Sequence, residues 1–392
     1  MLKLGTARQV PRGVWVLGFV SLLMDVSSEM VHGLLPVFMV STLGAGALAV
    51  GMVEGVAEAT ALIAKVFSGA LSDLVGRRKE LAAFGYALGA LSKPLFALAA
   101  GVNGVLGARF LDRVGKGMRG APRDALIADL TPAPLRGAAY GLRQSLDTVG
   151  AFLGPLIAVA LMRFWPGDFR KVFWCALLPG LLAVALLSLG VREPKSSAAA
   201  PKEPLHWRSL EPLDAAYWRI VILGAAFALA RFSEAFLILR ARQKGLPDFL
   251  APLVLVAMNA VYALAAYPAG LLADRSDRRL LMAAGLAVLI ASDLALAWAP
   301  DLAAVAVGVV LWGLHLGLTQ GVLAAMIADA APARLRGSAF GLFNLAAGAA
   351  MLAASALAGL LWDTAGSGAT FYAGAAFALI ALCFLPRKLA PA

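Results

Sequence analysis

Long apolar runs recur throughout the sequence, and they constrain the fold more than any other feature. A helix needs about 20 predominantly apolar residues to cross the hydrocarbon core of a bilayer. Hydrophobic residues make up 61% of the chain and charged residues only 15%, which is too little charge to cover a soluble core. The sequence therefore predicts an all-α membrane protein with twelve transmembrane helices. They are expected at residues 13–40, 47–71, 80–100, 104–126, 136–163, 171–190, 217–240, 249–273, 280–299, 302–327, 337–361 and 369–386.

A polar stretch at residues 192–215 divides these helices into six and six. It is rich in Pro, Ser, Ala and Lys, a composition typical of a linker. We predict an N-terminal six-helix bundle over residues 1–191 and a C-terminal six-helix bundle over residues 216–392. The linker between them is expected in the cytoplasm.

Lys and Arg are concentrated in alternate connections between the apolar runs. Cytoplasmic loops of membrane proteins carry such an excess of cations. We therefore expect both termini in the cytoplasm. Two connections depart from the pattern, one around Arg170 and one around residues 240–244.

The same distribution accounts for the net charge of +11 without a nucleic-acid partner. Cys175 and Cys383 lie inside apolar runs, so neither a disulfide framework nor a metal site or cofactor is expected. The abundance of Ala, Gly, Leu and Arg suggests a bacterial source. We expect a monomeric, multi-pass protein of the inner membrane, surrounded by lipid bilayer.

The sequence repeats itself at an interval of about 200 residues. IADLTPAPLRGAAYGL at 127–142 matches IADAAPARLRGSAFGL at 327–342, and GALSDLVGRR at 69–78 matches GLLADRSDRR at 270–279. Two independent matches at nearly the same interval indicate an internal duplication. The two halves are therefore expected to have the same topology and orientation.

The first copy of the shorter repeat carries Gly69, Asp73, Arg77 and Arg78 between the second and third predicted helices. It resembles the signature loop of the major facilitator superfamily, and Asp274 and Arg278 lie in the second copy, between the eighth and ninth helices. The resemblance implies two six-helix bundles around a central cavity that opens to alternate sides of the membrane. Asp73 and its basic neighbours are expected to pair with Asp124 or Asp129 and to lock one conformation. Alternatively, the cations of the loop only fix the topology.

A second motif lies in the fifth predicted helix, at Gly141, Gly150, Gly154 and Pro155. It resembles the fifth-helix motif of drug–proton antiporters, although Ala158-Val159 stands where that family has Gly-Gly. The resemblance implies export, while ordinary helix packing through small residues is the alternative. GKGMRG at 115–120 fits a nucleotide-binding pattern, but it lies inside a predicted span rather than after a strand.

Ionisable residues inside the predicted helices recur at helical spacing, so that each set occupies one face. The candidate proton-binding residues are Asp25, Glu29, His32, Glu54 and Glu58. The candidate substrate and cavity residues are Arg109, Arg113, Lys116, Arg143 and Asp147 in the first half, and Arg231, Glu234, Asn259 and Tyr262 in the second. A charge at the middle of a transmembrane helix costs about 2.5–3.5 kcal/mol on insertion scales, so these side chains should face the bundle interior.

The leading hypothesis is a proton-coupled secondary transporter that exports a small organic molecule. In this hypothesis at least one carboxylate binds and releases a proton in each cycle, with Glu29 first, then Asp25, Glu54 and Glu58. Alternatively, the acids form static pairs with the basic residues. A proton symporter or carrier for the uptake of an organic anion is the second function, and a non-transporting receptor or scaffold is the third. No pattern of a nucleophile and a base favours an enzyme.

Overall fold

The computed structural model describes residues 10–75, 77–132, 135–193, 215–273, 277–330, 336–383 and 385. Helices and short connections form this part of the chain, and it contains no strand. The predicted all-α class is therefore confirmed. The helices of the first half are α2 (Arg12–His32), α3 (Leu35–Ser41), α4 (Ala47–Val75), α5 (Arg78–Leu98), α6 (Val102–Leu130), α7 (Arg136–Phe164) and α8 (Phe169–Gly190).

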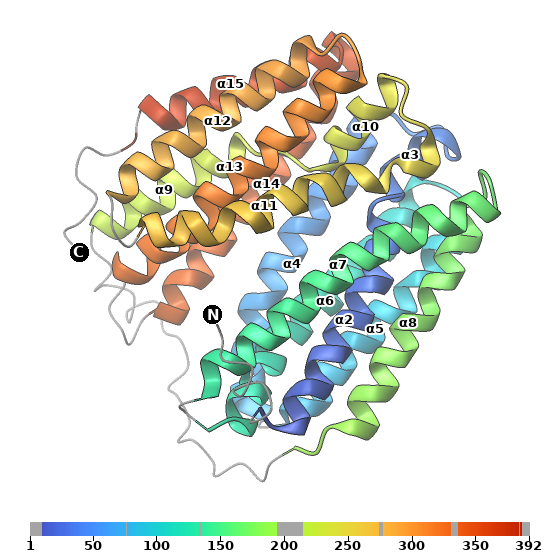
Figure 1. The fold of residues 1–392 in the computed structure, drawn as a ribbon, viewed down its shortest axis with the longest axis vertical. Helices are drawn as coiled ribbons and strands as arrows, with labels where there is room; N and C mark the ends of the chain where they lie inside the picture. Colours follow the sequence, from blue (N-terminus) through green and yellow to red (C-terminus); the bar gives the residue numbers. More distant parts are fainter. Residues whose placement is uncertain are drawn as a thin grey trace. The chain divides into compact units, whose positions relative to one another are not determined.

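The helices of the second half are α9 (Ala215–Leu229), α10 (Ala235–Gln243), the 3₁₀ turn η3 (Asp248–Leu250), α11 (Pro252–Ala273), α12 (Arg278–Trp298), α13 (Leu302–Ala330), α14 (Arg336–Ala365) and α15 (Ser367–Cys383) (Figure 1). Their bounds repeat at the interval of the sequence motifs. The helices α5, α6 and α7 begin at residues 78, 102 and 136, and α12, α13 and α14 begin at 278, 302 and 336. The duplication therefore extends to the secondary structure.

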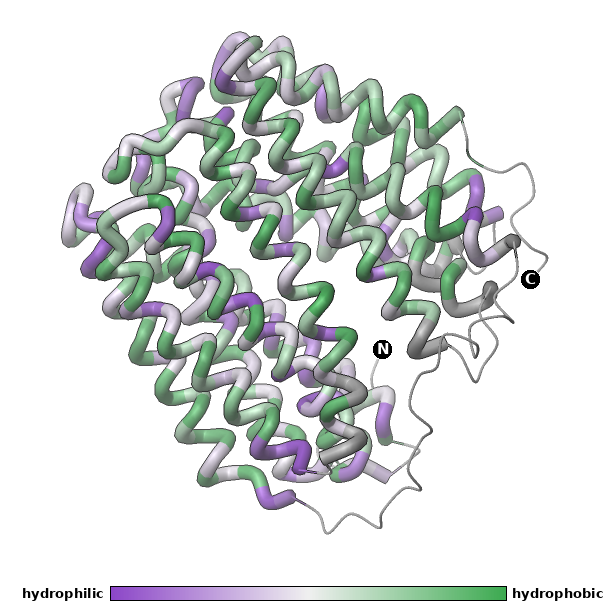
Figure 2. Tube along the Cα trace, turned by 180° about the vertical axis from the view of Figure 1, so that it is seen from behind, coloured by the Kyte–Doolittle hydropathy of each residue, from purple (hydrophilic) through white to green (hydrophobic). Residues whose placement is uncertain are grey.

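Nine stretches within the described residues are long and apolar enough to cross a membrane, and two shorter apolar helices accompany them. Figure 2 shows hydrophobic residues along most of the helices, interrupted by hydrophilic ones. Helix α6 is not among the nine, although it is 29 residues long, because it carries many charged residues. The number of twelve spans remains a prediction.

The first predicted helix of each half is interrupted in the structure. Residues 13–40 and 217–240 were expected to be continuous, but Gly33 and Leu34 separate α2 from α3, and residues 230–234 separate α9 from α10. Pro36 accounts for the first break, because proline lacks the N–H that continues a helix and clashes with the preceding turn. At the second break, side chains satisfy freed backbone groups: Ser355 Oγ accepts from Ser233 N at 3.1 Å, and Ser233 Oγ accepts from Ala235 N at 3.2 Å.

The chain forms two compact units, which we describe separately. Unit 1 consists of Met1–Phe38 and Thr60–Glu203, and unit 2 consists of Met39–Ala59 and Pro204–Ala392. In unit 1, α2 packs on α7 and α8, and α5 packs on α6 and α8. In unit 2, α9 packs on α14 and α15, and α12 packs on α13 and α15. The same helix pairs therefore recur in both units.

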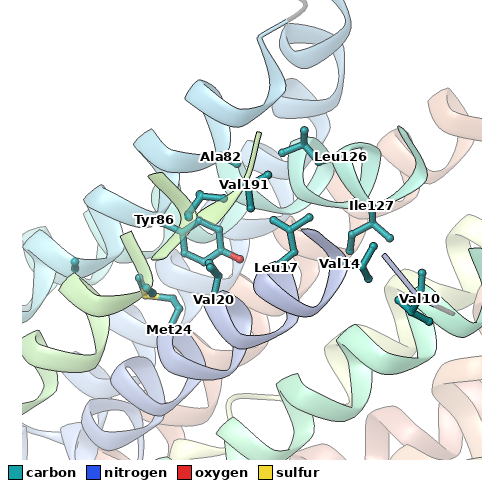
Figure 3. Packing of buried hydrophobic residues seen from close by; sticks show 14 residues of the cluster. Val10, Val14, Leu17, Val20, Met24, Ala82, Tyr86, Leu126, Ile127 and Val191 are labelled. Carbon is teal, nitrogen blue, oxygen red and sulfur yellow. The ribbon is translucent and has the colours of Figure 1, made fainter. Parts of the chain in front are cut away.

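An apolar cluster holds α2 in unit 1. Val14, Leu17, Val20 and Met24 recur every three or four residues, so they share one side of α2. Figure 3 shows this cluster, which combines Val10 and the α2 residues with Ala82 and Tyr86 of α5, Leu126 and Ile127 of α6, and Val191. Because this side of α2 is packed, the adjoining side with Asp25 and Glu29 is fixed in direction.

Candidate functional site

Two glycines of α7 allow α2 to approach at the position of its acids. A Cβ atom added at Gly150 would lie 2.5 Å from the Leu22 carbonyl oxygen and 3.0 Å from Asp25 Cβ. A Cβ atom at Gly154 would lie 2.8 Å from Glu29 Cβ. Such distances exclude any larger residue unless the helices separate. Two glycines of the sequence motif, followed by the buried Pro155, thus lie directly against the predicted proton-binding residues.

Gly141, the first glycine of the same motif, has different surroundings. A Cβ atom at this position would meet nothing within 4 Å. A larger side chain would therefore fit at position 141 without meeting a neighbouring helix.

Charged residues from α2, α6 and α7 meet beside these glycines. Asp25 lies within electrostatic range of Asp147, Arg119, Lys116 and Glu29. Asp25 and Asp147 are both partly exposed, and Lys116 is exposed although it lies in the middle of α6. We call this set, together with His32 and Arg143, the unit 1 polar cluster. It contains three carboxylates and three permanently charged cations.

Some members of the unit 1 polar cluster already have partners. Glu29 lies 3.4 Å from Nδ1 of His32, one turn along α2, and is also within range of Lys116 and Arg113. The Arg143 guanidinium forms an ion pair with Asp147, one turn along α7. Asp147 thus has a cationic partner on its own helix, whereas Asp25 is surrounded by charges of both signs.

A separate ion network lies between α5 and α6, and it is fully buried. Lys93 Nζ donates to Asp112 Oδ1 at 2.7 Å and to Ser28 Oγ at 3.3 Å. Arg109 and Arg113 approach the other oxygen of Asp112 at 3.8 and 3.9 Å. All four charged residues are at most 4% exposed. Arg109 and Arg113 were predicted to line a cavity, and the structure places both in this network.

Sequence reasoning did not assign a role to Lys93. The available signal was its position inside the apolar run 80–100, where an isolated cation is as unusual as the acids of α2. A partner for it could not be chosen, because the sequence does not show that α5 packs on α6.

Aromatic and hydroxyl groups complete the polar interior of unit 1. The Arg119 guanidinium lies over the Tyr86 ring, 5.1 Å from its centre. Arg123 Nη1 donates to Ser21 Oγ at 3.1 Å, and Ser21 Oγ lies 3.3 Å from the Tyr86 hydroxyl. The face of α6 is thereby tied to both α2 and α5.

The loop that follows α4 forms ion pairs at the start of α5. Arg78 pairs with Asp129 of α6, and its backbone N–H donates to Glu193 Oε1 at 2.6 Å. Arg77 pairs with Glu80 at 3.3 Å, and Asp124 pairs with Arg123 at 3.1 Å. Asp129 is one of the two carboxylates that were expected to pair with this loop, and it pairs with Arg78. Glu193 also binds the loop, through the Arg78 backbone, and the sequence did not predict this contact.

Four of the predicted gate residues cannot be placed in full. The structure gives α4 and α12 as helices, but the surroundings of Gly69 and the side chains of Asp73 and Arg278 lie outside what it describes, and so does the whole of Asp274.

In unit 2, four predicted residues come together around Arg231. This arginine lies in the break between α9 and α10, within electrostatic range of Glu234, Glu58 and Tyr262. Its guanidinium is 5.9 Å from the centre of the Phe227 ring. We call Arg231, Glu234, Glu58 and Tyr262 the unit 2 polar cluster.

The two other predicted residues of this region lie on the helices of that cluster. Asn259 is partly exposed and precedes Tyr262 by one turn on α11, and Glu54 is buried one turn before Glu58 on α4. Among the described residues, no three His, Cys, Asp or Glu side chains converge as metal ligands would.

The fold and the comparisons with known proteins agree on the family. The profile described as "Major Facilitator Superfamily" matches residues 17–254 and 220–392. The chain belongs to this superfamily. The resemblance drawn from the signature loop is therefore confirmed, and this major facilitator protein is a multi-pass membrane transporter of small molecules rather than an enzyme.

Relatives and solved structures extend the comparison of this major facilitator protein. It is 30% identical over 380 residues to an uncharacterized MFS-type transporter of Methanocaldococcus jannaschii, covering 95% of this chain and 94% of the relative. It is 29% identical over 199 residues to the multidrug resistance protein MdtH of Photorhabdus laumondii, covering 51% and 48%. The nucleoside transporter NupG has the same fold, with a TM-score of 0.77 at 13% identity and coverage of 95% and 98%.

Proposed function

We propose that this transporter couples the export of a small organic molecule to protons and works by alternating access. The observation that carries the proposal is the unit 1 polar cluster, in which Asp25 lies near two further carboxylates and two cations. These charges belong to three different membrane helices. The carboxylates of Asp25, Glu29 and Asp147 are partly exposed and Lys116 is exposed, whereas Arg119 and the network around Asp112 are buried.

The composition of the unit 1 polar cluster suits reversible proton binding. Neighbouring carboxylates resist being ionised together, and Asp25 lies within electrostatic range of Glu29 and Asp147. A nearby cation has the opposite effect, because it stabilises the ionised form. A change in the distance between α2 and the cations Lys116 and Arg119 of α6 would therefore bind or release a proton. His32, beside Glu29, is placed to relay it.

The unit 2 polar cluster is proposed to contact the substrate. Arg231 and Tyr262 offer hydrogen-bond donors, and Glu58 and Glu234 offer acceptors. Asn259 is partly exposed on the same helix as Tyr262. Export as the direction is supported by the similarity to a multidrug resistance protein and by the place of Gly150 and Gly154 against the acids of α2.

Transport measurements in proteoliposomes test this proposal. We expect an imposed pH gradient to drive accumulation of a compound from a panel of fluorescent organic cations, and its addition to move protons across the membrane. Asp25→Asn or Glu29→Gln should abolish the proton movement. Glu80→Gln, at an exposed position in the first turn of α5, is the control and should leave it unchanged. Equal proton flux in all of these proteins would refute the coupling role of the cluster.

A second function is favoured by the excess of cations in α6. Three cations surround the single carboxylate of Asp112, and Lys116 is exposed one turn further along the helix. This charge balance suits an organic anion that is taken up with protons. Uptake of radiolabelled carboxylates into vesicles, lost in Lys116→Gln, would favour this function over export.

A further inference from the structure

One buried carboxyl group of unit 2 takes no part in the clusters described above. Asp293 of α12 is 0% exposed, and neither of its oxygens has a hydrogen-bond partner in the described part of the chain. A Cβ atom added at Gly374 of α15 would lie 2.5 Å from Asp293 Oδ2 and 2.9 Å from Phe232 Cε1. The carboxyl group and the ring of Phe232 therefore both lie against the α15 backbone at Gly374.

The Phe232 ring near this carboxyl group belongs to a cluster of aromatic side chains. The ring of Phe232 lies 5.3 Å from Trp312, 5.5 Å from Phe236 and 5.5 Å from Phe371, measured between ring centres. Trp312 Nε1 is also buried without a hydrogen-bond partner among the described residues. An aromatic environment of this kind solvates a negative charge poorly.

Neither oxygen of Asp293 is hydrogen-bonded to a charged side chain in the described residues. Two cationic or titratable side chains lie on the neighbouring elements. His315 of α13 directs Nδ1 to the Gly285 carbonyl oxygen at 2.8 Å, and its buried Nε2 has no hydrogen-bond partner among the described residues. Arg240 of α10 donates to the carbonyl oxygens of Leu296 and Ala297 at 2.9 and 3.0 Å. From α15, the buried polar residues are the uncharged Ser367 and Thr370.

The repeat shows how unusual this arrangement is. Position 293 corresponds to position 93 at the interval of 200 residues, where Lys93 pairs with Asp112. The counterpart of Asp112 is Trp312, which offers no charge. The first half thus fills this place with an ion pair, and the second half fills it with a single acid.

We propose that Asp293 is a second proton-binding site, which holds its proton in the conformation seen here. An ionised carboxylate without a partner is costly in an apolar interior, whereas the neutral acid is far less so. Release of the proton requires that water or a cation reach the carboxyl group. Phe232 lies against the same position of α15 and belongs to the break between α9 and α10, next to Arg231 of the unit 2 polar cluster. Movement of this break is the proposed route by which water reaches Asp293.

The use of this proton in transport rests on the proposed function, but the presence of the proton does not. Infrared difference spectroscopy of the full-length protein in lipid nanodiscs detects a protonated carboxyl group by its carbonyl stretching band. We expect this band at neutral pH and expect Asp293→Asn to remove it. Asp301→Asn, which changes an exposed carboxylate at the start of α13, should leave the band in place.

A second pair of variants keeps the test decisive if Asp293→Asn does not fold. Gly374→Ala brings a methyl group against Asp293 Oδ2 and should shift the frequency of the band. Gly368→Ala lies on the same helix, where the nearest contact of its Cβ would be an ordinary 3.6 Å, and should not shift it.

The outcomes separate the proton site from the transport mechanism. A wild-type spectrum without the band means that Asp293 is ionised, for instance as an acceptor for Trp312 Nε1, and overturns the proposal. A band that neither Asp293→Asn nor Gly374→Ala alters belongs to another acid and also overturns it. If the band belongs to Asp293 while no variant of the unit 1 polar cluster changes proton flux, the proposed coupling fails and the second site stands.

Discussion

Lys93 and Asp112 show how opposite charges persist inside an apolar bundle. Their side chains are 1% and 4% exposed and lie 2.7 Å apart, and Ser28 and Ser92 provide further polar contacts. Taking either charge out of water costs several kcal/mol, so the pair depends on the completeness of its partners. The two ends of the pair are not equivalent, because Arg109 and Arg113 also approach Asp112.

This asymmetry predicts different effects of removing each partner. Asp112→Leu removes the carboxylate that Lys93, Arg109 and Arg113 share and should lower the free energy of unfolding by about 3–5 kcal/mol. Lys93→Met should cost less, because Arg109 and Arg113 still neutralise Asp112. Unfolding by denaturant in detergent micelles measures both, with Glu80→Gln as the neutral control. Equal losses, or a larger loss for Lys93→Met, would contradict the network described here.

The sequence identified most of the buried charges but few of their partners. Asp25, Glu29 and Lys116 were expected to face the bundle interior, and the structure brings them within electrostatic range of one another. The sequence did not predict the pairing of Lys93 with Asp112. It also did not predict that Asp293 would be buried without a hydrogen-bond partner among the described residues. Both features depend on which helix faces meet. Helical spacing fixes which residues share a face of one helix, but it contains no information about the helix opposite.

The contact between α2 and α7 depends on the absence of side chains at two positions. Gly154→Ala places a methyl group 2.8 Å from both Glu29 Cβ and the Val26 carbonyl oxygen. Overpacking of this kind costs about 1–3 kcal/mol, so we expect a lower thermal midpoint and altered proton coupling. Gly141→Ala, which meets nothing within 4 Å on the same helix, should be neutral or slightly stabilising. Equal midpoints for the two variants would show that the helices separate without cost.

Helix α4 begins at a cap that comes from the other end of the sequence. Asp363 of α14 accepts from the N–H groups of Ala47 and Leu48 at 2.9 and 2.8 Å. Helix N-termini present unpaired N–H groups and a partial positive charge, which a carboxylate satisfies. Asp363→Ala should therefore cost about 1 kcal/mol of stability. Thr364→Ala, whose hydroxyl donates only to the Leu360 carbonyl within α14, is the adjacent control for thermal unfolding.

The helix breaks mark where sequence reasoning failed for a whole element. Pro36 was a signal for the first break, since proline interrupts a helix at the residues before it. No such signal stands at residues 230–234, where the hydroxyl groups of Ser233 and Ser355 stabilise the break. Ser355 is 122 residues away, so the long-range contact cannot be read from the local pattern.

Across the whole molecule, two arginines explain why the charge pattern of the loops is imperfect. Arg170 donates to the carbonyl oxygens of Ala97 and Ala99 at the end of α5, and Arg240 donates to those of Leu296 and Ala297 at the end of α12. Both cations satisfy helix carbonyl groups that have no partner within the helix. They belong to the two connections that depart from the expected alternation of charge, where their role is packing.

This role predicts that removing either arginine changes stability but not topology. Arg170→Ala and Arg240→Ala should each lower the unfolding free energy by about 1–3 kcal/mol, because buried carbonyl groups lose their donors. Reporter fusions at both ends of the chain should report the same orientation in each variant as in the unchanged protein. An inverted orientation in either variant would mean that these cations take part in setting the topology.

The interval of 200 residues was the most informative feature for the fold as a whole. It predicted that the helices would repeat, and α6 and α13 indeed span residues 102–130 and 302–330. The charges did not repeat in the same way, as Lys93 and Asp293 show. The same helix pairs pack together in both halves, but the polar residues at equivalent positions differ. The interval therefore predicted the helices of the second half but not its polar contacts.

The interruptions of α2–α3 and α9–α10 bear on the history of the chain. They fall at residues 33–34 and 230–234, which are equivalent once the 200-residue interval is subtracted. The surrounding sequences, GLLP at 33–36 and SEAF at 233–236, have no residue in common. We infer that the six-helix ancestor already had a bent first helix before its gene was copied. Each descendant then kept the bend by its own chemistry, proline in one and serine hydroxyls in the other.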